Sequence, residues 1–322
     1  MFKLNEIYDL YWRFAAERQD IFFKRLTGQT SNLTDDAILS TYRFTNAYRA
    51  SDRVSQFLIR HVIYFGDQSP KEVFFRTLLF RFFNRISTWE KLNAALKGRI
   101  SYADYDFRLY DNILTTFIND KNKIYSAAYI MPSGIREFGF ARKHQNNLKL
   151  LECMMQDNAP ERIAGIGNLN KTFNILRSYP TLGDFLAYQY TIDLAYSDLD
   201  CGLESDFIAP GPGALRGIRK CFSDTGKLTP SEVIHYVTER QQEEFSIRGI
   251  NFQNLYSRPL QLIDCQNIFC EIDKYARAYN PELSMGGRTR IKQKFSINTE
   301  SIKLFYPPKW GINDRIPEQC RS

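Results

Sequence analysis

A loop rich in carboxylates follows one of the predicted helices, and its side chains could do acid–base or electrostatic chemistry. Its four acidic residues are Asp198, Asp200, Glu204 and Asp206. A buried carboxylate beside a sugar can stabilise an oxocarbenium-like transition state while it orients or deprotonates water, as cleavage of an N-glycosidic bond requires. We take Asp206 as the candidate catalytic carboxylate and keep the other three as competitors. The alternative is an N-cap or loop acid, which is the commoner role of an Asp beside Ser and Pro-Gly.

A tight turn lies upstream of this loop, where one predicted helix stops and the next begins at once. It contains Pro180 and Gly183, and the helix after it starts with an apolar face. Such a turn leaves backbone N–H groups pointing outward at a helix N-terminus, an arrangement that binds phosphate. We therefore name Pro180, Leu182 and Gly183 as candidate phosphate contacts. A plain turn between two helices has the same pattern and is the alternative.

The segment Tyr179-Pro180-Thr181-Leu182-Gly183 resembles the helix-hairpin-helix of DNA base-excision glycosylases, whose pattern is Leu-Pro-Gly-[Val/Ile]-Gly. Thr181 stands in place of the first hairpin glycine. The resemblance implies that the hairpin contacts DNA and that a carboxylate after the next helix, here Asp206, serves catalysis. Bifunctional members carry a lysine two residues after the last glycine, where this chain has Phe185. The resemblance therefore implies a monofunctional enzyme that leaves an abasic site.

A polar stripe interrupts an apolar stretch that the periodicity predicts to be one helix, from Thr34-Asp35-Asp36 to Val62. The stripe has three- and four-residue spacing and consists of Asn46, Arg49, Asp52, Arg53 and Gln56. Buried arginines are rare unless paired, so one interpretation is an ion pair between helices, with Asp52 or Glu271 as the acid. The other is a polar pocket that hydrogen-bonds a flipped base. We assign to this candidate pocket Asn46, Arg49, Arg53, Gln189, Glu271 and Lys274.

The last long predicted helix carries a second candidate acid. Asp273 shares a helix face with Gln266 and Arg277, close to the side that a pocket would use. Glu271 and Lys274 are an i,i+3 pair that can simply stabilise the helix. We therefore place Asp273 second to Asp206 as the catalytic acid.

Aromatic and basic residues alternate in the run Phe80-Arg81-Phe82-Phe83-Asn84-Arg85, which precedes a capping signal at Ser87. In the glycosylase fold, the corresponding helix end supplies a side chain that fills the space left by a flipped base. Asn84 and Arg85 are the candidates for this DNA contact. A core helix followed by an N-cap at Ser87 explains the same residues and is the simpler interpretation.

Three ordered motifs carry a second resemblance: residues 42–56, the turn Gly211-Pro212-Gly213-Ala214, and residues 266–277. They resemble the alpha-glutamyl/putrescinyl thymine pyrophosphorylase family, which is related to the helical domain of hydroxymethyluracil DNA kinases. The resemblance implies a glycosylase-like helical fold and a link to phage DNA hypermodification, with some members acting in anti-phage defence. Gly211 and Gly213 accordingly join the candidate DNA contacts.

The composition predicts a folded protein, because 43% of the 322 residues are hydrophobic and 15% are aromatic. A net charge of +7 suits a nucleic-acid partner. No apolar run approaches the roughly 20 residues of a membrane helix, and the charged N-terminus does not match a signal peptide, so we expect a cytoplasmic protein without membrane contact. Six scattered cysteines and three histidines lead us to expect reduced thiols, no metal site and no cofactor.

The fold that we expect is all-α, a helix-hairpin-helix glycosylase-like fold in which two helical lobes flank a cleft. Helical periodicity prevails along the chain, and alternating β-branched runs are nearly absent. Residues 1–285 are expected to form the helical domain, with the hairpin at 176–187. Residues 286–322 are expected to form a basic tail packed on its body. We expect a monomer.

Three functional hypotheses follow. The first is a monofunctional DNA glycosylase that flips and excises a bulky 5-substituted pyrimidine from double-stranded phage DNA, in anti-phage defence. The second is a transferase that replaces pyrophosphate on a 5-pyrophosphomethyl pyrimidine with an amine, while arginines and lysines bind the leaving diphosphate. The third is a non-catalytic module that binds modified DNA. The carboxylate after the hairpin, in a sequence without a P-loop, favours the first.

Overall fold

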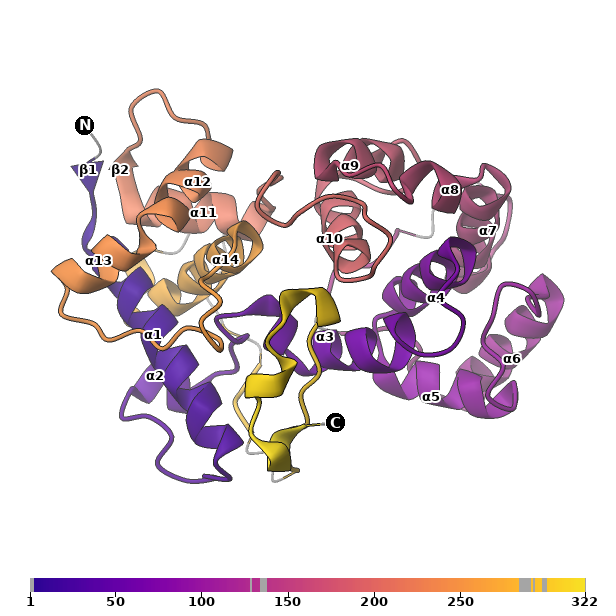
Figure 1. The fold of residues 1–322 in the computed structure, drawn as a ribbon, viewed down its shortest axis with the longest axis horizontal. Helices are drawn as coiled ribbons and strands as arrows, with labels where there is room; N and C mark the ends of the chain where they lie inside the picture. Colours follow the sequence, from indigo (N-terminus) through magenta and orange to yellow (C-terminus); the bar gives the residue numbers. More distant parts are fainter. Residues whose placement is uncertain are drawn as a thin grey trace. The chain divides into compact units, whose positions relative to one another are not determined.

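The computed structural model describes residues 3–127, 129–133, 138–283, 291, 293–296 and 300–321. Contacts divide the chain into two compact units (Figure 1): unit 1 comprises Met1–Asp52 and Ile208–Ser322, and unit 2 comprises Arg53–Phe207. The N-terminal helix thus folds with the C-terminal part of the chain, a division that differs from the expected one at residue 285. Much of the basic stretch expected to begin the tail, residues 286–290 and 292, lies outside the described residues.

The described residues of unit 1 form helices and one small antiparallel sheet, in which Lys3 pairs with Asp224 and Leu4 with Phe222. Its elements in chain order are β1 (Lys3–Leu4), α1 (Glu6–Leu26), α2 (Ala37–Thr41), the 3-10 turn η1 (Arg49–Ser51), α11 (Pro212–Cys221), β2 (Phe222–Asp224), α12 (Pro230–Glu239), α13 (Gln241–Ile247), α14 (Leu262–Tyr279), and the 3-10 turns η4 (Pro281–Leu283), η5 (Pro308–Trp310), η6 (Asn313–Arg315) and η7 (Glu318–Cys320).

Unit 2 is helical throughout its described part. Its elements are α3 (Arg53–Leu58), the π-helical turn η2 (Ile59–Ile63), α4 (Pro70–Phe83), α5 (Ile86–Ala95), α6 (Phe107–Asn119), α7 (Lys143–Gln156), α8 (Ala159–Ile163), α9 (Leu169–Arg177) and α10 (Asp184–Ala195). For the described residues, the all-α expectation is confirmed. Among the described residues of both units, no helix combines the length and the hydropathy that a membrane span needs.

Helix α14 lies at the centre of unit 1, where α1, α11 and α12 pack against it (Figure 1). Its close contact with α11 depends on two glycines. A Cβ on Gly217 would lie 2.0 Å from the backbone oxygen of Phe269, and a Cβ on Gly213 would lie 2.3 Å from Cys270 Sγ. Larger side chains at these positions would push the two helices apart. The glycine turn and the last motif of the sequence therefore lie side by side.

Helix α4 lies at the centre of unit 2 and is buried on almost all sides, which explains its lack of a polar face. Phe74, Leu78 and Phe82 are completely enclosed, and α7, α8 and α10 contact the helix. Arg81 forms an ion pair with Asp193 of α10 at an Nε–Oδ2 distance of 2.5 Å, and both side chains are buried. Removal of either partner would leave an uncompensated buried charge, so this pair ties α4 to α10.

The described part of the C-terminal segment, residues 300–321, packs on the rest of unit 1. Tyr306 is fully buried, and its hydroxyl lies 2.8 Å from Ser51 Oγ. The Arg258 guanidinium lies over the Trp310 ring, 3.8 Å from its centroid, in a cation–π contact. This segment thus contacts the loop that ends at Asp52.

Replacing Gly217 with Ala should destabilise unit 1. The new Cβ would meet backbone rather than a flexible side chain, so the two helices must move apart. The free energy of unfolding should fall by about 2 kcal/mol or more. Urea unfolding followed by circular dichroism measures the loss. Gly183→Ala is the matched control, because no atom lies within 4 Å of its Cβ, and it should change stability by less than about 1 kcal/mol. Equal losses in the two variants would contradict this packing.

Candidate functional site

Residues 42–52 of unit 1 form a loop that includes the η1 turn. The α2 helix ends before this segment and α3 begins after it, so the expectation of one long helix is wrong. Asn46 Nδ2 donates to the Ser51 carbonyl, and Asp52 Oδ1 accepts the Asn46 backbone N–H, both at 2.9 Å. Short polar side chains that bind backbone in this way compete with helical hydrogen bonds. The first three residues of the polar stripe, Asn46, Arg49 and Asp52, therefore lie in a loop, and only Arg53 and Gln56 lie on a helix, α3.

Arg18 on α1 fixes the middle of this loop. Its Nε donates to the Thr45 carbonyl and its Nη2 donates to Asn46 Oδ1, both at 2.9 Å. The residue is 9% exposed; burial lowers the pKa of the guanidinium, while the charges of Asp52 and Glu271 raise it. Since arginine stays charged in proteins, Arg18 is a buried cation. In the sequence, Arg18 is one charge within an amphipathic helix, and its spacing does not mark it as part of a site.

Two residues of α14 reach the same loop. Glu271 Oε2 accepts the Thr45 backbone N–H at 3.2 Å and lies 2.8 Å from Lys274 Nζ. The Lys274 ammonium lies over the Phe44 ring, 4.4 Å from its centroid, where cation–π attraction adds to the ion pair. The structure thus brings together four of the predicted pocket residues with two further charges. We call this group the charged cluster; it consists of Arg18, Asn46, Arg49, Asp52, Glu271 and Lys274.

Arg49 begins η1 and is buried. Its backbone N–H donates to Asp264 Oδ1 at 2.8 Å. Burial raises the pKa of Asp264 to about 6, although backbone N–H groups of Gln261 and Arg49 and the charges of Arg258 and Arg49 oppose the rise. Asp264 is 4% exposed. Its carboxyl group therefore fixes the loop from α14 rather than meeting a ligand.

Asp52 is half-buried, and its carboxyl group titrates near neutral pH. Burial raises its pKa to about 7, and the negative charge of Glu271 adds to the rise; the Asn46 N–H and the charges of Arg18 and Arg49 oppose it. A carboxyl group with such a pKa can both accept and donate a proton at neutral pH, as general acid–base catalysis requires. The sequence indicates only an ion-pair role for Asp52, because its proton affinity depends on Arg18 and Glu271, which are far away in the sequence.

Asp273, the second candidate acid, is an internal ion-pair partner. It is 2% exposed, and its carboxylate lies 3.0 Å from both Arg216 Nε and Lys220 Nζ. Both cations lie on α11, four residues apart, so the three charges join α11 to α14. This packing explains Asp273 without a ligand.

The remaining predicted catalytic and pocket residues lie in unit 2. Asp206 is exposed, and its carboxylate accepts hydrogen bonds from the Leu203 backbone N–H at 3.2 Å and from Ser205 Oγ at 3.0 Å. Arg53 is exposed at the start of α3, and Gln189 on α10 is half-buried. None of these three predicted residues belongs to the charged cluster.

Three candidate DNA contacts take part in internal packing. The Gly211 backbone N–H donates to Gln266 Oε1 at 3.2 Å, and Gly213 lies against α14. Asn84 is 4% exposed, and its Oδ1 accepts from Arg81 Nη1 at 2.7 Å. These positions connect helices, and we do not carry them forward as DNA contacts.

The turn between α9 and α10 leaves one glycine open to solvent. Leu182 is buried, Pro180 is half-buried, and Gly183 is exposed at the N-terminus of α10. Thr181 has a φ of +66°, a conformation that glycine adopts most readily. Arg85, just before α5, is half-buried, and its Nε donates to Ser87 Oγ at 2.9 Å.

A cavity of about 380 Å³ in unit 1 is rich in carboxylates. It is lined by α1, the loop before α2, and Tyr275, whose hydroxyl donates to Asp36 Oδ2 at 2.6 Å. No group of three or more His, Cys, Asp or Glu side chains within the described ranges is arranged to hold a metal ion. We call this cavity the acidic pocket; its charged residues are Glu17, Asp20, Asp35 and Asp36 against Arg13 and Lys24.

Comparisons with known proteins link this chain to DNA modification. Residues 5–285 match the family described as "5-hmdU DNA kinase, helical domain". A 5-hmdU DNA kinase of Bacillus phage SP10 is 24% identical, over 94% of this chain and 50% of the relative. The chain therefore spans about half the length of that relative. No solved structure matches.

These comparisons overturn the prediction of a monofunctional glycosylase. A kinase transfers a phosphoryl group, whereas a glycosylase hydrolyses an N-glycosidic bond. Without a glycosylase reaction, Asp206 has no role in base excision. Its exposed position in a loop agrees with this. The expected relation to phage DNA hypermodification is supported, and the transferase hypothesis fits the comparisons better than base excision does.

Replacing Asp52 with Asn should flatten the dependence of stability on pH. The folded-state pKa of about 7 lies above the unfolded-state value of about 3.9. The folded protein therefore binds the extra proton, and stability from this group is complete below about pH 4 and is lost as pH rises to about 7. Between these limits, the unfolding free energy of the wild type should fall by about 3 kcal/mol more than that of the variant.

Urea unfolding at a series of pH values measures this difference. Asp35→Asn is the control, because Asp35 is also an aspartate of unit 1 but is exposed. Its pH profile should match that of the wild type. A wild-type slope in the Asp52→Asn variant would contradict the assignment of a raised pKa to Asp52.

Proposed function

Because the chain belongs to the family of 5-hmdU DNA kinase helical domains, we propose that it acts on 5-substituted pyrimidine bases in DNA, in group transfer at the 5-substituent. The observation that carries this proposal is the family match over residues 5–285. The charged cluster is the site that we assign to it, since two of the three motifs that resemble DNA-hypermodification proteins meet there. The chain spans half of the relative, so the proposal covers recognition of the base and proton transfer at its substituent.

Group transfer to a hydroxymethyl substituent needs a base that takes the hydroxyl proton. Asp52 is the candidate, because its pKa of about 7 leaves it partly ionised at neutral pH and able to hold a proton. Lys274 is half-buried and lies 2.8 Å from Glu271 Oε2 in the same cluster, and its ammonium group can meet the negative charge of a phosphoryl group. The buried Arg18 and Asn46 then have a positioning role, because they hold the loop that carries Asp52.

We propose in addition that the α9–α10 turn contacts the DNA backbone, as in a helix-hairpin-helix. Thr181 adopts the left-handed conformation at the position where that pattern has glycine. Gly183 exposes the N-terminus of α10, whose free N–H groups suit a phosphate. The Arg177 guanidinium lies 2.5 Å from Asp184 Oδ1 and so offsets the one acidic residue in the first turn of α10.

A second candidate reaction is the replacement of pyrophosphate on a 5-pyrophosphomethyl pyrimidine by an amine. The acidic pocket favours it, because four carboxylates face two cations there. A negatively charged cavity attracts an ammonium group, and the rings of Phe14 and Tyr275 in its lining can add cation–π contacts. In both reactions Lys274 would meet a negative group, either the transferred phosphoryl group or the leaving pyrophosphate. The reactions differ in the nucleophile, which is the hydroxymethyl oxygen in the first and an amine in the second.

Asp52→Asn should abolish most of the group transfer while DNA binding persists. Loss of one acid–base group lowers a rate by about 10²-fold or more. The assay incubates the protein with DNA containing 5-hydroxymethyluracil and ATP, or with 5-pyrophosphomethyl DNA and an amine, and measures nucleoside masses. A phosphorylated nucleoside selects the kinase reaction and an amine adduct selects the second. Asp206→Asn is the control and should keep full activity.

Two results would contradict this proposal. The first is unchanged nucleosides in both reactions together with equal affinity for modified and unmodified DNA. The second is a fully active Asp52→Asn variant. Unchanged nucleosides with tighter binding of modified DNA would instead select the non-catalytic binding hypothesis. The mass of the product therefore separates transfer from recognition.

Gly183→Val should weaken the binding of modified and unmodified duplexes to the same degree. The side chain fits the open space around Gly183 but blocks approach of a phosphate to the α10 N-terminus. A loss of about tenfold is expected for hydrogen bonds to a charged group. Electrophoretic mobility shifts with the two duplexes measure it, and thermal unfolding checks that the variant folds. Unchanged affinity in a folded variant would remove this turn from the DNA interface.

A further inference from the structure

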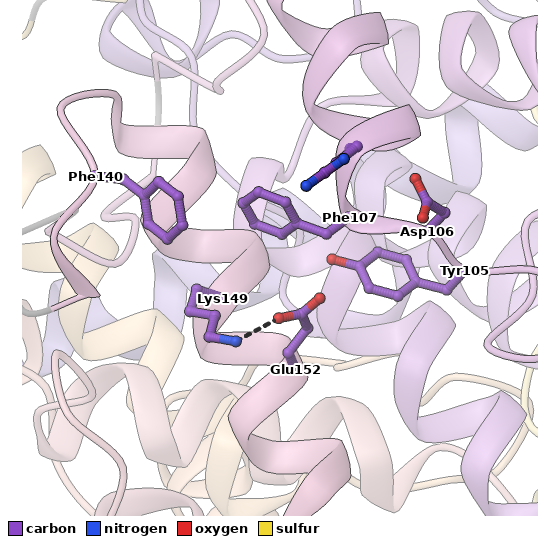
Figure 2. Close-up of a pocket in the computed structure, with 7 residues that line it drawn as sticks. Tyr105, Asp106, Phe107, Phe140, Lys149 and Glu152 are labelled. Atoms are coloured by element: carbon purple, nitrogen blue, oxygen red, sulfur yellow. Dashed lines mark hydrogen bonds and ion pairs between the residues drawn. The ribbon is translucent and has the colours of Figure 1, made fainter.

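Unit 2 contains a second cavity, of about 390 Å³, between the start of α6 and the α7 helix (Figure 2). Its size falls in the range of small-molecule sites. Three aromatic residues line it, together with two acids and two bases. These residues are Tyr105, Phe107 and Phe140, with Asp106, Glu152, Arg108 and Lys149.

The aromatic rings form one side of this cavity. Phe107 and Phe140 face each other with centroids 5.2 Å apart, and both are half-buried. Tyr105 is held in place by Phe75 and Tyr110, whose ring centroids lie 5.2 and 4.8 Å from its own. A group of aromatic rings that line one cavity suits a flat, unsaturated ligand more than an aliphatic one.

Polar groups occupy the other side. Lys149 Nζ and Glu152 Oε2 form an ion pair at 2.8 Å, and Figure 2 shows the Tyr105 hydroxyl directed toward the space beside them. That hydroxyl oxygen is buried and has no hydrogen-bond partner among the described residues. Burial and the charge of Glu152 raise the pKa of Tyr105, so the hydroxyl keeps its proton and can donate it. A buried polar group without a partner costs free energy, which a ligand can recover.

We propose that this cavity binds a nucleobase. Every nucleobase is flat and carries an N–H donor beside a carbonyl or ring-nitrogen acceptor, which Glu152 and Lys149 complement. The two acids and two bases of the lining balance, so the cavity does not select a highly charged ligand. The base belongs either to a DNA strand or to a free nucleotide, and Arg108, exposed at the start of α6, can meet its phosphate. This proposal is independent of the charged cluster in unit 1.

The experiment compares a labelled single-stranded oligonucleotide of mixed sequence, the same strand with abasic sites, and free nucleoside monophosphates. Fluorescence anisotropy measures the strands, and calorimetry measures the mononucleotides. Phe107→Leu should weaken binding of the base-containing ligand by about tenfold, the usual size of one lost stacking contact. Phe117→Leu is the matched control, since it makes the same change in the same helix outside the cavity. It should bind as the wild type does.

Tyr105→Phe guards against a variant that fails to fold. It removes only a hydroxyl without a protein partner, so the melting temperature should not fall, while affinity for the base should. Loss of affinity for mononucleotides identifies a free nucleotide as the ligand, and loss confined to the oligonucleotide identifies a DNA strand. Equal binding of intact and abasic strands with no mononucleotide binding, or wild-type affinity in both folded variants, would overturn the proposal.

Discussion

The burial of the Arg18 guanidinium is the constraint on which the charged cluster depends. A buried cation needs hydrogen-bond acceptors, and here they are the Thr45 carbonyl and the Asn46 amide oxygen. The backbone N–H groups of the same two residues donate to Glu271 and Asp52. Two adjacent residues thus connect the arginine to both carboxylates. One buried charge thereby fixes the loop and the positions of both acids.

The helical class could be predicted from the sequence, but the loop at residues 42–52 could not. Periodicity indicates which helix face is apolar, and it succeeds for α1 and α14 because each packs through such a face. It fails at the loop because Asn46 and Asp52 bind backbone groups there, and their alternative, a helix, has the same spacing. The acceptors that favour the loop over a helix are Glu271 and Asp264. They bind the backbone N–H groups of Thr45 and Arg49 and belong to α14, a distant part of the chain. The pairing of the loop with α14 was anticipated only through Glu271.

The glycosylase prediction failed at the step from local to tertiary structure. Pro180 and Gly183 mark the end of one helix and the start of the next, and a local pattern suffices to predict this. The role of Asp206 required instead that a carboxylate be enclosed next to a substrate, and it is exposed and bonded to its own loop. Spacing along the chain sets the order of elements. It does not set the burial and neighbouring charges that determine proton affinity, which are the causes of the raised pKa at Asp52.

The charge balance around Asp52 suits a reaction that brings negative charge to the cluster. Glu271 raises the pKa of Asp52, and Lys274, 2.8 Å from Glu271, offsets that negative charge. A phosphoryl or diphosphate group that draws Lys274 toward itself would weaken this compensation and add negative charge of its own. Both effects raise the Asp52 pKa further. Under the proposed function, Asp52 must therefore release its own proton before it can take that of the attacking hydroxyl, so the binding of the charged group and the protonation state of Asp52 are coupled.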